Sequence, residues 1–210
     1  HEGLFPKDRY VICNGYKTPQ YIDKIAELVN GGFKNVVPIF DNLNEVDLLS
    51  EKLDKPTHCG IRIASEEEPK FEFYTSRLGI GFNDVIPLYK AKLKNNKKLK
   101  LKMLHFFINT GIKDTSYYWS ELLKVVKAYC ELKKICPSLS TLNIGGGLPI
   151  KNSLSFDYNY EYMIEEIVRQ IKMYCNKEGV QEPDIFTEFG SYTVGESGAL
   201  LLKIVDQKKQ

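Results

Sequence analysis

Short apolar runs alternate with longer amphipathic segments along this chain, and this alternation constrains the fold more than any other feature. The runs are rich in Val, Ile, Leu and Phe on both faces, as strands are when helices cover a parallel sheet. The amphipathic segments have the length and the apolar spacing of helices. The pattern therefore predicts an α/β fold of repeated βα units. The runs lie at residues 10–14, 35–40, 58–63, 102–108, 141–144 and 185–189.

Three of the amphipathic segments carry a continuous apolar stripe, and polar residues or glycines mark several helix ends. The stripes run over residues 21–29, 119–132 and 160–171. Gly31 and Gly32 are typical of a helix end, whereas Asn44 predicts the start of the next helix. Residues 114–116 offer a cap for the helix that contains Trp119. The stripes predict core positions.

The length of 210 residues leaves two architectures open. A complete (β/α)8 barrel needs about 250 residues and eight strands, so this chain is roughly two units short. A doubly wound open sheet fits the length better, and part of a barrel fits the alternation equally well. A further apolar run, at residues 200–205, adds one terminal strand. Because the first residue is His1 and not methionine, we expect a piece of a longer parent protein.

The charge and cysteine content point away from several classes of protein. Lys and Arg number 29 against 27 Asp and Glu, so the net charge is +2. This balance predicts neither a nucleic-acid partner nor a membrane partner, and the absence of a signal or spanning segment makes the cytoplasm the expected location. The five cysteines and three histidines lack metal-ligand spacing, so we expect reduced thiols and no zinc site. The lysines at 97–102 precede an apolar run and predict a solvated segment.

Two motifs at strand ends have residue types that suit an anionic or a cationic ligand. Gly145, Gly146 and Gly147 follow a buried strand, where their amides can approach a phosphate closely. A tight turn with positive φ is the alternative interpretation. Glu188 ends the last strand and can hold a protonated ring nitrogen, or accept bonds from backbone amides instead.

Two further strand residues need partners if they are buried. Arg62 lies in a strand expected to be covered on both faces, so it requires an anion, for which Glu188 or a cofactor is a candidate. His105 also lies in a strand, and a structural role is the simpler interpretation for a single histidine. Residues 64–77 form an irregular loop of the kind that often has a function.

The order and spacing of several motifs resemble the barrel domain of the biosynthetic arginine decarboxylases. These enzymes belong to the alanine-racemase-like, fold-type III group that uses pyridoxal phosphate, with ornithine and diaminopimelate decarboxylases as relatives. The resemblance covers nearly the whole chain and selects a partial (β/α)8 barrel of the alanine racemase type over the open sheet. The motifs that carry it lie at residues 13–17, 60–62, 76–79, 104–106, 143–149 and 188–190.

The resemblance implies pyridoxal phosphate as the cofactor, and magnesium as a second one. It implies that Gly145, Gly146 and Gly147 bind the phosphate, that Glu188 pairs with the pyridine nitrogen and that Arg62 lies near the ring. The remaining residues expected at the cofactor are Phe107, which replaces the family's stacking histidine, Thr110 and Gly190.

Three departures from the family set the limits of this expectation. Asn109 and Ser191 replace a glycine and an arginine of the family pattern. The family's Schiff-base lysine, in a Tyr-Pro-Ile-Lys-Val-Asn type of motif, is absent from these residues, and Lys17 is not expected to replace it. The C-terminal β domain that completes the neighbouring subunit's site is absent too. We therefore expect residues 1–210 to be the central to C-terminal part of the barrel domain.

The expected function is that of an arginine decarboxylase, which forms agmatine and carbon dioxide for polyamine synthesis. We expect the parent to be a homo-oligomeric enzyme and the isolated chain to be inactive, because covalent catalysis needs the lysine. A non-catalytic barrel that binds pyridoxal phosphate or mediates oligomerisation is one alternative. A related decarboxylase for ornithine, lysine or diaminopimelate is another. Unpaired strands at 10–14 and 200–205 should make the isolated chain prone to association.

Overall fold

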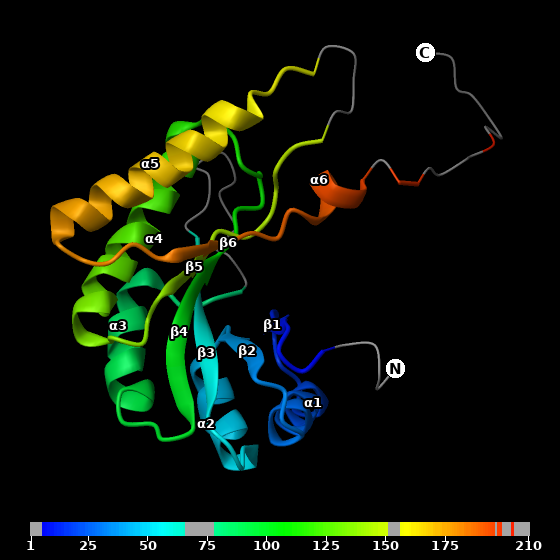
Figure 1. Cartoon of the computed structure of the whole chain (residues 1–210), viewed down its shortest axis with the longest axis vertical. Helices are drawn as coiled ribbons and strands as arrows, with labels where there is room; N and C mark the ends of the chain where they lie inside the picture. The colour runs from blue at the N-terminus through cyan, green and yellow to red at the C-terminus, as the bar shows by residue number, and fades with distance from the viewer. Residues whose placement is uncertain (1–5, 66–77, 151–155, 196, 199–202, 204–210) are drawn as a thin grey trace, which may run out of the picture.

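Six parallel strands form one curved sheet with helices along it (Figure 1). The computed structural model describes residues 6–65, 78–150, 156–195, 197, 198 and 203. The predicted terminal strand at 200–205 and nearly all of the loop at 64–77 lie outside these residues. The strands are β1 (Tyr10–Cys13), β2 (Asn35–Phe40), β3 (Thr57–Ile63), β4 (Leu99–Phe106), β5 (Thr141–Asn143) and β6 (Asp184–Phe186).

The strand order identifies the architecture. Each strand pairs in parallel with the next one along the chain, from β1 to β6. A doubly wound sheet reverses its strand order at a switch point, whereas a barrel adds each new strand to the same edge. The described strands never reverse. The sequence-based expectation of a partial barrel is therefore confirmed, and the open doubly wound sheet is excluded for the part of the chain described.

Helices connect the strands. In Figure 1, α3, α4 and α5 lie along the left-hand side of the sheet, and α6 follows β6 on the other side. The helices are α1 (Pro19–Asn30), α2 (Leu43–Lys52), α3 (Val85–Leu88), α4 (Ser116–Ile135), α5 (Tyr160–Glu178) and α6 (Gly190–Val194). A 3₁₀ turn, η1 (Phe82–Asp84), and a π-helical turn, η2 (Tyr89–Leu93), flank α3.

Side-chain caps explain where the longer helices begin. Thr18 and Thr115 accept bonds from the amides three residues later at the starts of α1 and α4. Helix α2 is capped by Asn42, the residue before Leu43, whose side chain accepts from the amides of Asn44 and Glu45. The prediction of Asn44 as the start was wrong by two residues, because Asn42 has the extended backbone that a cap requires.

The segment between β3 and β4 contains helical structure that the sequence analysis did not predict. Val85, Leu88, Tyr89 and Leu93 bury their side chains there against the core. The lysines at 97–102 were predicted to precede the strand. In the structure β4 begins at Leu99, so Lys100 and Lys102 belong to the strand itself. Lys102 donates to the Tyr10 hydroxyl at 2.9 Å, so it links β4 to β1 and is not simply solvated.

The two faces of the sheet have different cores. The outer face packs against the helices in one large apolar cluster. The concave face carries a small cluster, to which alternate positions of four strands contribute: Ile12, Val37, Ile39, Met103 and Phe186. Curvature brings the first and last described strands together, since the rings of Tyr10 and Phe186 lie 5.1 Å apart without any backbone pairing of β1 with β6.

Candidate functional site at the carboxyl ends of the strands

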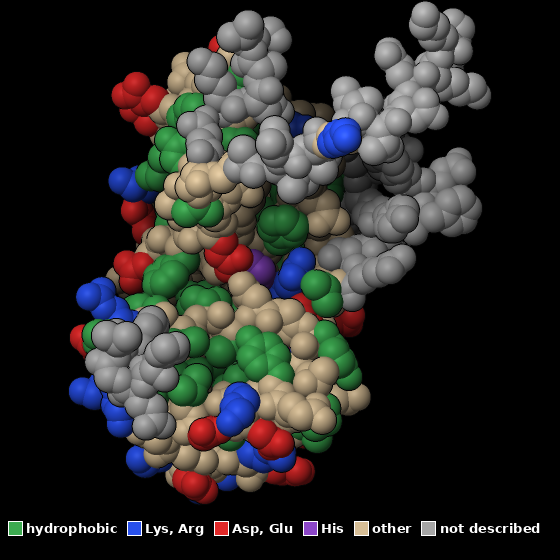
Figure 2. All heavy atoms as spheres, turned by 90° about the vertical axis from the view of Figure 1, so that its right-hand side faces the viewer, with side chains coloured by type: hydrophobic (Ala, Val, Ile, Leu, Met, Phe, Trp, Pro, Cys, Tyr) green, Lys and Arg blue, Asp and Glu red, His purple; other side chains and the backbone are tan. Residues whose placement is uncertain are grey.

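Polar and charged side chains gather where the parallel strands end. Figure 2 shows acidic, basic and histidine side chains together at the middle of the face that is turned toward the viewer. The carboxyl ends of parallel strands meet at one edge of a barrel, which is where barrel proteins place their sites. The residues contributed by successive strands and their loops are Asn14, Lys17, Asp41, Arg62, His105, Asn143 and Glu188.

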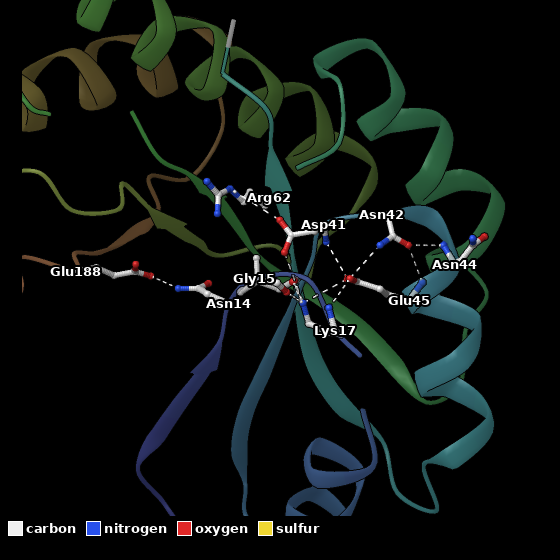
Figure 3. Close-up of polar contacts among 10 residues, drawn as sticks. Asn14, Gly15, Lys17, Asp41, Asn42, Asn44, Glu45, Arg62 and Glu188 are labelled. Carbon is white, nitrogen blue, oxygen red and sulfur yellow. Dashed lines mark hydrogen bonds and ion pairs between the residues drawn. The ribbon is translucent and has the colours of Figure 1, made fainter. Parts of the chain in front are cut away.

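Glu188 is fixed through one of its two carboxylate oxygens. The side-chain amide of Asn14 donates to Oε1 at 2.7 Å (Figure 3). The side-chain amide of Asn143 donates to the same oxygen at 2.8 Å. His105 Nε2 lies 3.8 Å from the same oxygen. Glu188 Oε2 has no polar partner among the described residues, and the side chain is 35% exposed. The predicted site carboxylate is therefore oriented, with one oxygen available to a ligand.

Arg62 has a different partner from the one expected. Its Nε lies 3.9 Å from Asp41 Oδ1 and forms no hydrogen bond to any described residue. Its guanidinium carbon lies 5.8 Å from the centre of the Phe107 ring. Burial lowers the pKa of Arg62, while Asp41 and Glu188 oppose that shift. Of the two candidate partners, Glu188 is not the one that Arg62 contacts, since Asp41 lies nearest to it, and the guanidinium lies beside Phe107.

Lys17 belongs to a buried charge cluster that the sequence analysis missed (Figure 3). Its Nζ donates to the carbonyls of Gly15, at 2.8 Å, and of Ile39, and to Glu45 Oε2 at 3.3 Å. Asp41 Oδ2 lies 3.9 Å away, and the Lys17 side chain is fully withdrawn from water. Burial raises the pKa of Asp41 against the opposing effects of Lys17 and Arg62.

Glu45 connects this cluster to the start of α2. Its carboxylate accepts bonds from the backbone amides of Lys17 and Asp41 and from the Asn42 side chain, at 2.9 to 3.0 Å. A glutamate at this position of a helix commonly reaches back to the residues that precede the helix. Here it also fixes the loop after β1, so one carboxylate sets the positions of two strand ends.

His105 is buried and neutral. Burial lowers its pKa from 6.5 to about 4, with Glu188 opposing and with Arg62 and Lys17 adding to the shift. Neither ring nitrogen forms a hydrogen bond within the described residues. Asn14 Oδ1 and both Asp41 oxygens are likewise buried without hydrogen-bond partners there. Buried polar atoms normally have partners, so this concentration of unpaired ones marks a site that binds a polar ligand or water.

The glycine segment packs among three loops. Gly145 and Gly147 have φ values of +69° and +100°. A Cβ on Gly146 would lie 2.5 Å from the Glu188 carbonyl, and one on Gly147 would lie 2.8 Å from the Gly111 Cα. The turn interpretation is therefore correct, since close packing alone requires glycine. The amides of Gly146 and Gly147 also donate to no acceptor among the described residues, so they remain available to an anion.

The other predicted site residues lie around this segment. Phe107 is half-buried, and its side chain would lie 3.2 Å from a Cβ on Gly145. Thr110 is half-buried in the turn that Gly111 closes through its bond to the Ile108 carbonyl. Gly190 begins α6 and donates to the Glu188 carbonyl at 2.7 Å. The structure therefore brings all the predicted residues to one end of the sheet.

Pyridoxal phosphate fits the chemistry of these residues. Lys17 and Arg62 oppose three carboxylates, those of Asp41, Glu45 and Glu188, with His105 neutral. A protonated pyridine ring supplies the missing positive charge, and Glu188 Oε2 is available to receive it. The Gly146 and Gly147 amides, which donate to no acceptor in the part of the chain that the structure describes, suit the phosphate at the other end. Among the described residues, no group of three or more His, Cys, Asp or Glu could hold a metal ion.

Comparison with known proteins identifies the family. The pyridoxal-binding domain of the pyridoxal-dependent decarboxylases matches residues 3–195. The chain belongs to this family. The resemblance inferred from the motif order is thereby confirmed at the level of the family. Among the described residues, no helix is long and apolar enough to cross a membrane.

Individual relatives agree with the family assignment. Arginine decarboxylase 2 of Arabidopsis thaliana is 26% identical over 219 residues, which cover 96% of this chain and 30% of the relative. The structure of the biosynthetic arginine decarboxylase of Campylobacter jejuni is 25% identical and has a TM-score of 0.69, covering 86% of this chain and 31% of that one. Diaminopimelate decarboxylase from M. jannaschii shares the fold, with 21% identity, a TM-score of 0.73, and coverage of 89% and 44%. The chain spans about a third of the length of the arginine decarboxylases it matches.

Proposed function

We propose that this chain is the cofactor-binding part of a pyridoxal-phosphate-dependent arginine decarboxylase. The parent enzyme would convert arginine to agmatine and carbon dioxide, in the cytoplasm and toward polyamines. The observation that carries the proposal is the oriented Glu188 carboxylate. It is held at the strand ends beside a glycine segment in which two amides have no acceptor among the described residues. Residues 1–210 would form the central to C-terminal part of the barrel domain.

Each residue would act on a particular part of the cofactor. Bound pyridoxal phosphate supplies an electron sink for the electron pair left when carbon dioxide departs. Glu188 would hold a proton at the ring nitrogen, which keeps the sink effective. Gly146 and Gly147 would bind the phosphate through their amides. Phe107 would pack against the ring.

The remaining site residues would set charge and orientation. Arg62 carries a positive charge beside Phe107, at a distance typical of a cation near an aromatic face. Thr110 would offer a hydroxyl to the phosphate, and the Gly145 and Gly190 backbones would shape the two loops that surround it. Magnesium is not part of the proposal, because the described residues contain no candidate metal cluster.

The substrate is proposed as arginine because the matched full-length relatives carry that name. Solved structures of the same fold include a diaminopimelate decarboxylase and a lysine decarboxylase. Neither is more than 21% identical to this chain, so they support the fold alone. Ornithine, lysine and diaminopimelate therefore serve as the competing substrates in the test.

The isolated chain is proposed to bind the cofactor without catalysing decarboxylation. Lys17 Nζ is committed to two carbonyls and to Glu45 in the interior. A lysine that acts on a cofactor must be able to reach it as a neutral amine. In the longer parent protein, an upstream barrel strand would supply the lysine, and in the homo-oligomer the C-terminal domain would complete the neighbouring subunit's site. The departures at Phe107, Asn109 and Ser191 favour the non-catalytic cofactor-binding barrel as the second candidate.

The first test measures pyridoxal phosphate binding to the chain by equilibrium dialysis. Wild-type chain should bind, Glu188→Ala should bind much more weakly, and Glu165→Ala, an exposed glutamate of α5, should bind like wild type. Equal binding by the Glu188 variant would contradict the proposed role of this residue.

The second test measures release of labelled carbon dioxide by the parent protein from arginine, ornithine, lysine and diaminopimelate. Preference for arginine supports the proposal. Preference for another of these amino acids selects a related decarboxylase. Cofactor binding without release from any of them selects the non-catalytic barrel.

A further inference from the structure

The contacts of Asn143 connect the two ends of the candidate cofactor site. Its Oδ1 accepts the Gly145 amide at 2.9 Å, and its Nδ2 donates to Glu188 Oε1 at 2.8 Å. The Glu188 amide in turn donates to the Gly145 carbonyl at 2.8 Å. The glycine segment and the carboxylate are therefore held at a fixed separation by one buried side chain and one backbone bond.

Asn14 reaches the same carboxylate from the opposite edge of the sheet. It follows β1, whereas Glu188 follows β6, and the two are 174 residues apart in the sequence. The 2.7 Å bond from Asn14 to Oε1 and the bond from Asn143 converge on one oxygen. Oε1 is thereby saturated with donors, and the second oxygen is the one presented to a ligand.

The chemical nature of these two donors matters. Both are neutral amides, so they orient the carboxylate and stabilise its ionised form without cancelling its charge. A lysine or arginine in direct contact would cancel that charge. The nearby cations are held elsewhere, because Arg62 lies beside Asp41 and Lys17 bonds to Glu45. Among the described residues, no lysine or arginine therefore forms a hydrogen bond or ion pair with the Glu188 carboxylate, which is left to a cationic ligand.

We propose that Asn14 and Asn143 are positioning residues that aim Glu188 at the ring nitrogen of the cofactor. Asn143 also sets the separation between that carboxylate and the phosphate-binding glycines. This inference rests on the proposed function and assigns roles to two residues outside the set predicted from the sequence. It accounts for why one polar side chain from the first strand and one from the fifth meet on a single oxygen.

The experiment uses pyridoxal phosphate labelled with ¹⁵N in the ring, bound to the full chain. The ¹⁵N chemical shift reports whether the ring nitrogen carries a proton, and a titration gives the affinity. The variants are Asn14→Ala, Asn143→Ala and Asn14→Leu, the last of which keeps nearly the size of the side chain and removes its donor without adding charge. Asn176→Ala, at an exposed position of α5, is the control, and circular dichroism checks folding.

We expect wild-type chain to bind with a protonated ring nitrogen. Loss of a hydrogen bond to a charged group should weaken binding by about tenfold or more and move the ¹⁵N shift toward the neutral ring. Asn14→Leu should behave like Asn14→Ala, and the control like wild type. If Asn143→Ala does not fold, the two Asn14 variants decide the matter.

Two outcomes would overturn the inference in different ways. Wild-type binding with a protonated ring, unchanged in folded Asn14 and Asn143 variants, would refute the positioning role and leave the proposed function intact. Absence of binding by the wild-type chain, under conditions where it is folded, would refute the proposed function and the inference with it.

Discussion

Asp41 lies between two cations, with its Oδ1 3.9 Å from Arg62 Nε and its Oδ2 3.9 Å from Lys17 Nζ. All three side chains are largely buried, so none can exchange its partner for bulk water. We expect Asp41→Ala to lower the free energy of unfolding by about 3 to 5 kcal/mol, because it leaves buried cations with too few partners. Urea denaturation measures this change. Asp23→Ala, which removes an exposed ion pair to Lys52, should cost less than about 1 kcal/mol.

Lys17 should resist chemical trapping. Its Nζ is buried and bonded to the Gly15 carbonyl and to Glu45, so it cannot reach an aldehyde without breaking these contacts. We expect borohydride reduction in the presence of pyridoxal phosphate to leave the peptide that contains Lys17 unmodified. Peptide mass spectrometry checks this, with exposed Lys24 as an internal reference for surface labelling. Preferential modification of Lys17 in folded protein would contradict the structure.

The stability of the chain should depend on pH through His105. Its pKa is about 4 in the folded chain against an ordinary value of 6.5, so the unfolded state binds more protons between these values. The contribution of neutral His105 to the free energy of unfolding is therefore fully present above pH 6.5. As the pH falls toward 4, the free energy of unfolding decreases by on the order of 3 kcal/mol. Urea denaturation of wild type and His105→Gln across this range measures it.

The His105→Gln variant should lose most of this pH dependence. His58 is the appropriate comparison, because burial lowers its pKa too, but it is only half-buried. We expect His58→Gln to retain the larger part of the dependence. Parallel curves for wild type and His105→Gln would show that His105 does not carry it.

Gly146 should be intolerant of any side chain. A Cβ there would lie 2.5 Å from the Glu188 carbonyl, so the loop after β6 would have to move. We expect Gly146→Ala to lower the free energy of unfolding by about 1 to 3 kcal/mol. Gly190→Ala is the control, since a Cβ at Gly190 meets nothing within 4 Å. Similar unfolding curves for both variants would argue against the packing of these loops.

Much of the fold was accessible from the sequence because its strands are apolar on both faces. Residues 35–40 were predicted as a strand with the bounds that β2 has. The helical segment at 82–93 was missed, although its buried positions recur at helical spacing. Pro87 argues against a helix there, because proline usually interrupts helices. In the structure it lies in the first turn of α3, where its missing N–H removes no intrahelical hydrogen bond.

The residues of the candidate site were predictable only where a single residue, by its type and position, requires a charged or polar partner. An arginine in a buried strand and a glutamate at a strand end both require partners, and this requirement singled out Arg62 and Glu188. Their actual partners, Asp41 and Asn14, follow different strands and approach only when the sheet curves. Lys17 gave no signal, because nothing in a lysine near a turn shows that it will be buried.

The meeting of β1 and β6 through side chains alone has a consequence for the order of folding. Asn14 and Glu188 are separated by 174 residues, so their contact forms only after a large loop of chain has been ordered. During synthesis, the strand that carries Asn14 would leave the ribosome long before Glu188 exists. The site is therefore expected to be among the last parts of the described structure to form. A chain stalled before β6 would have helices α1 to α5 and most of the sheet without the carboxylate.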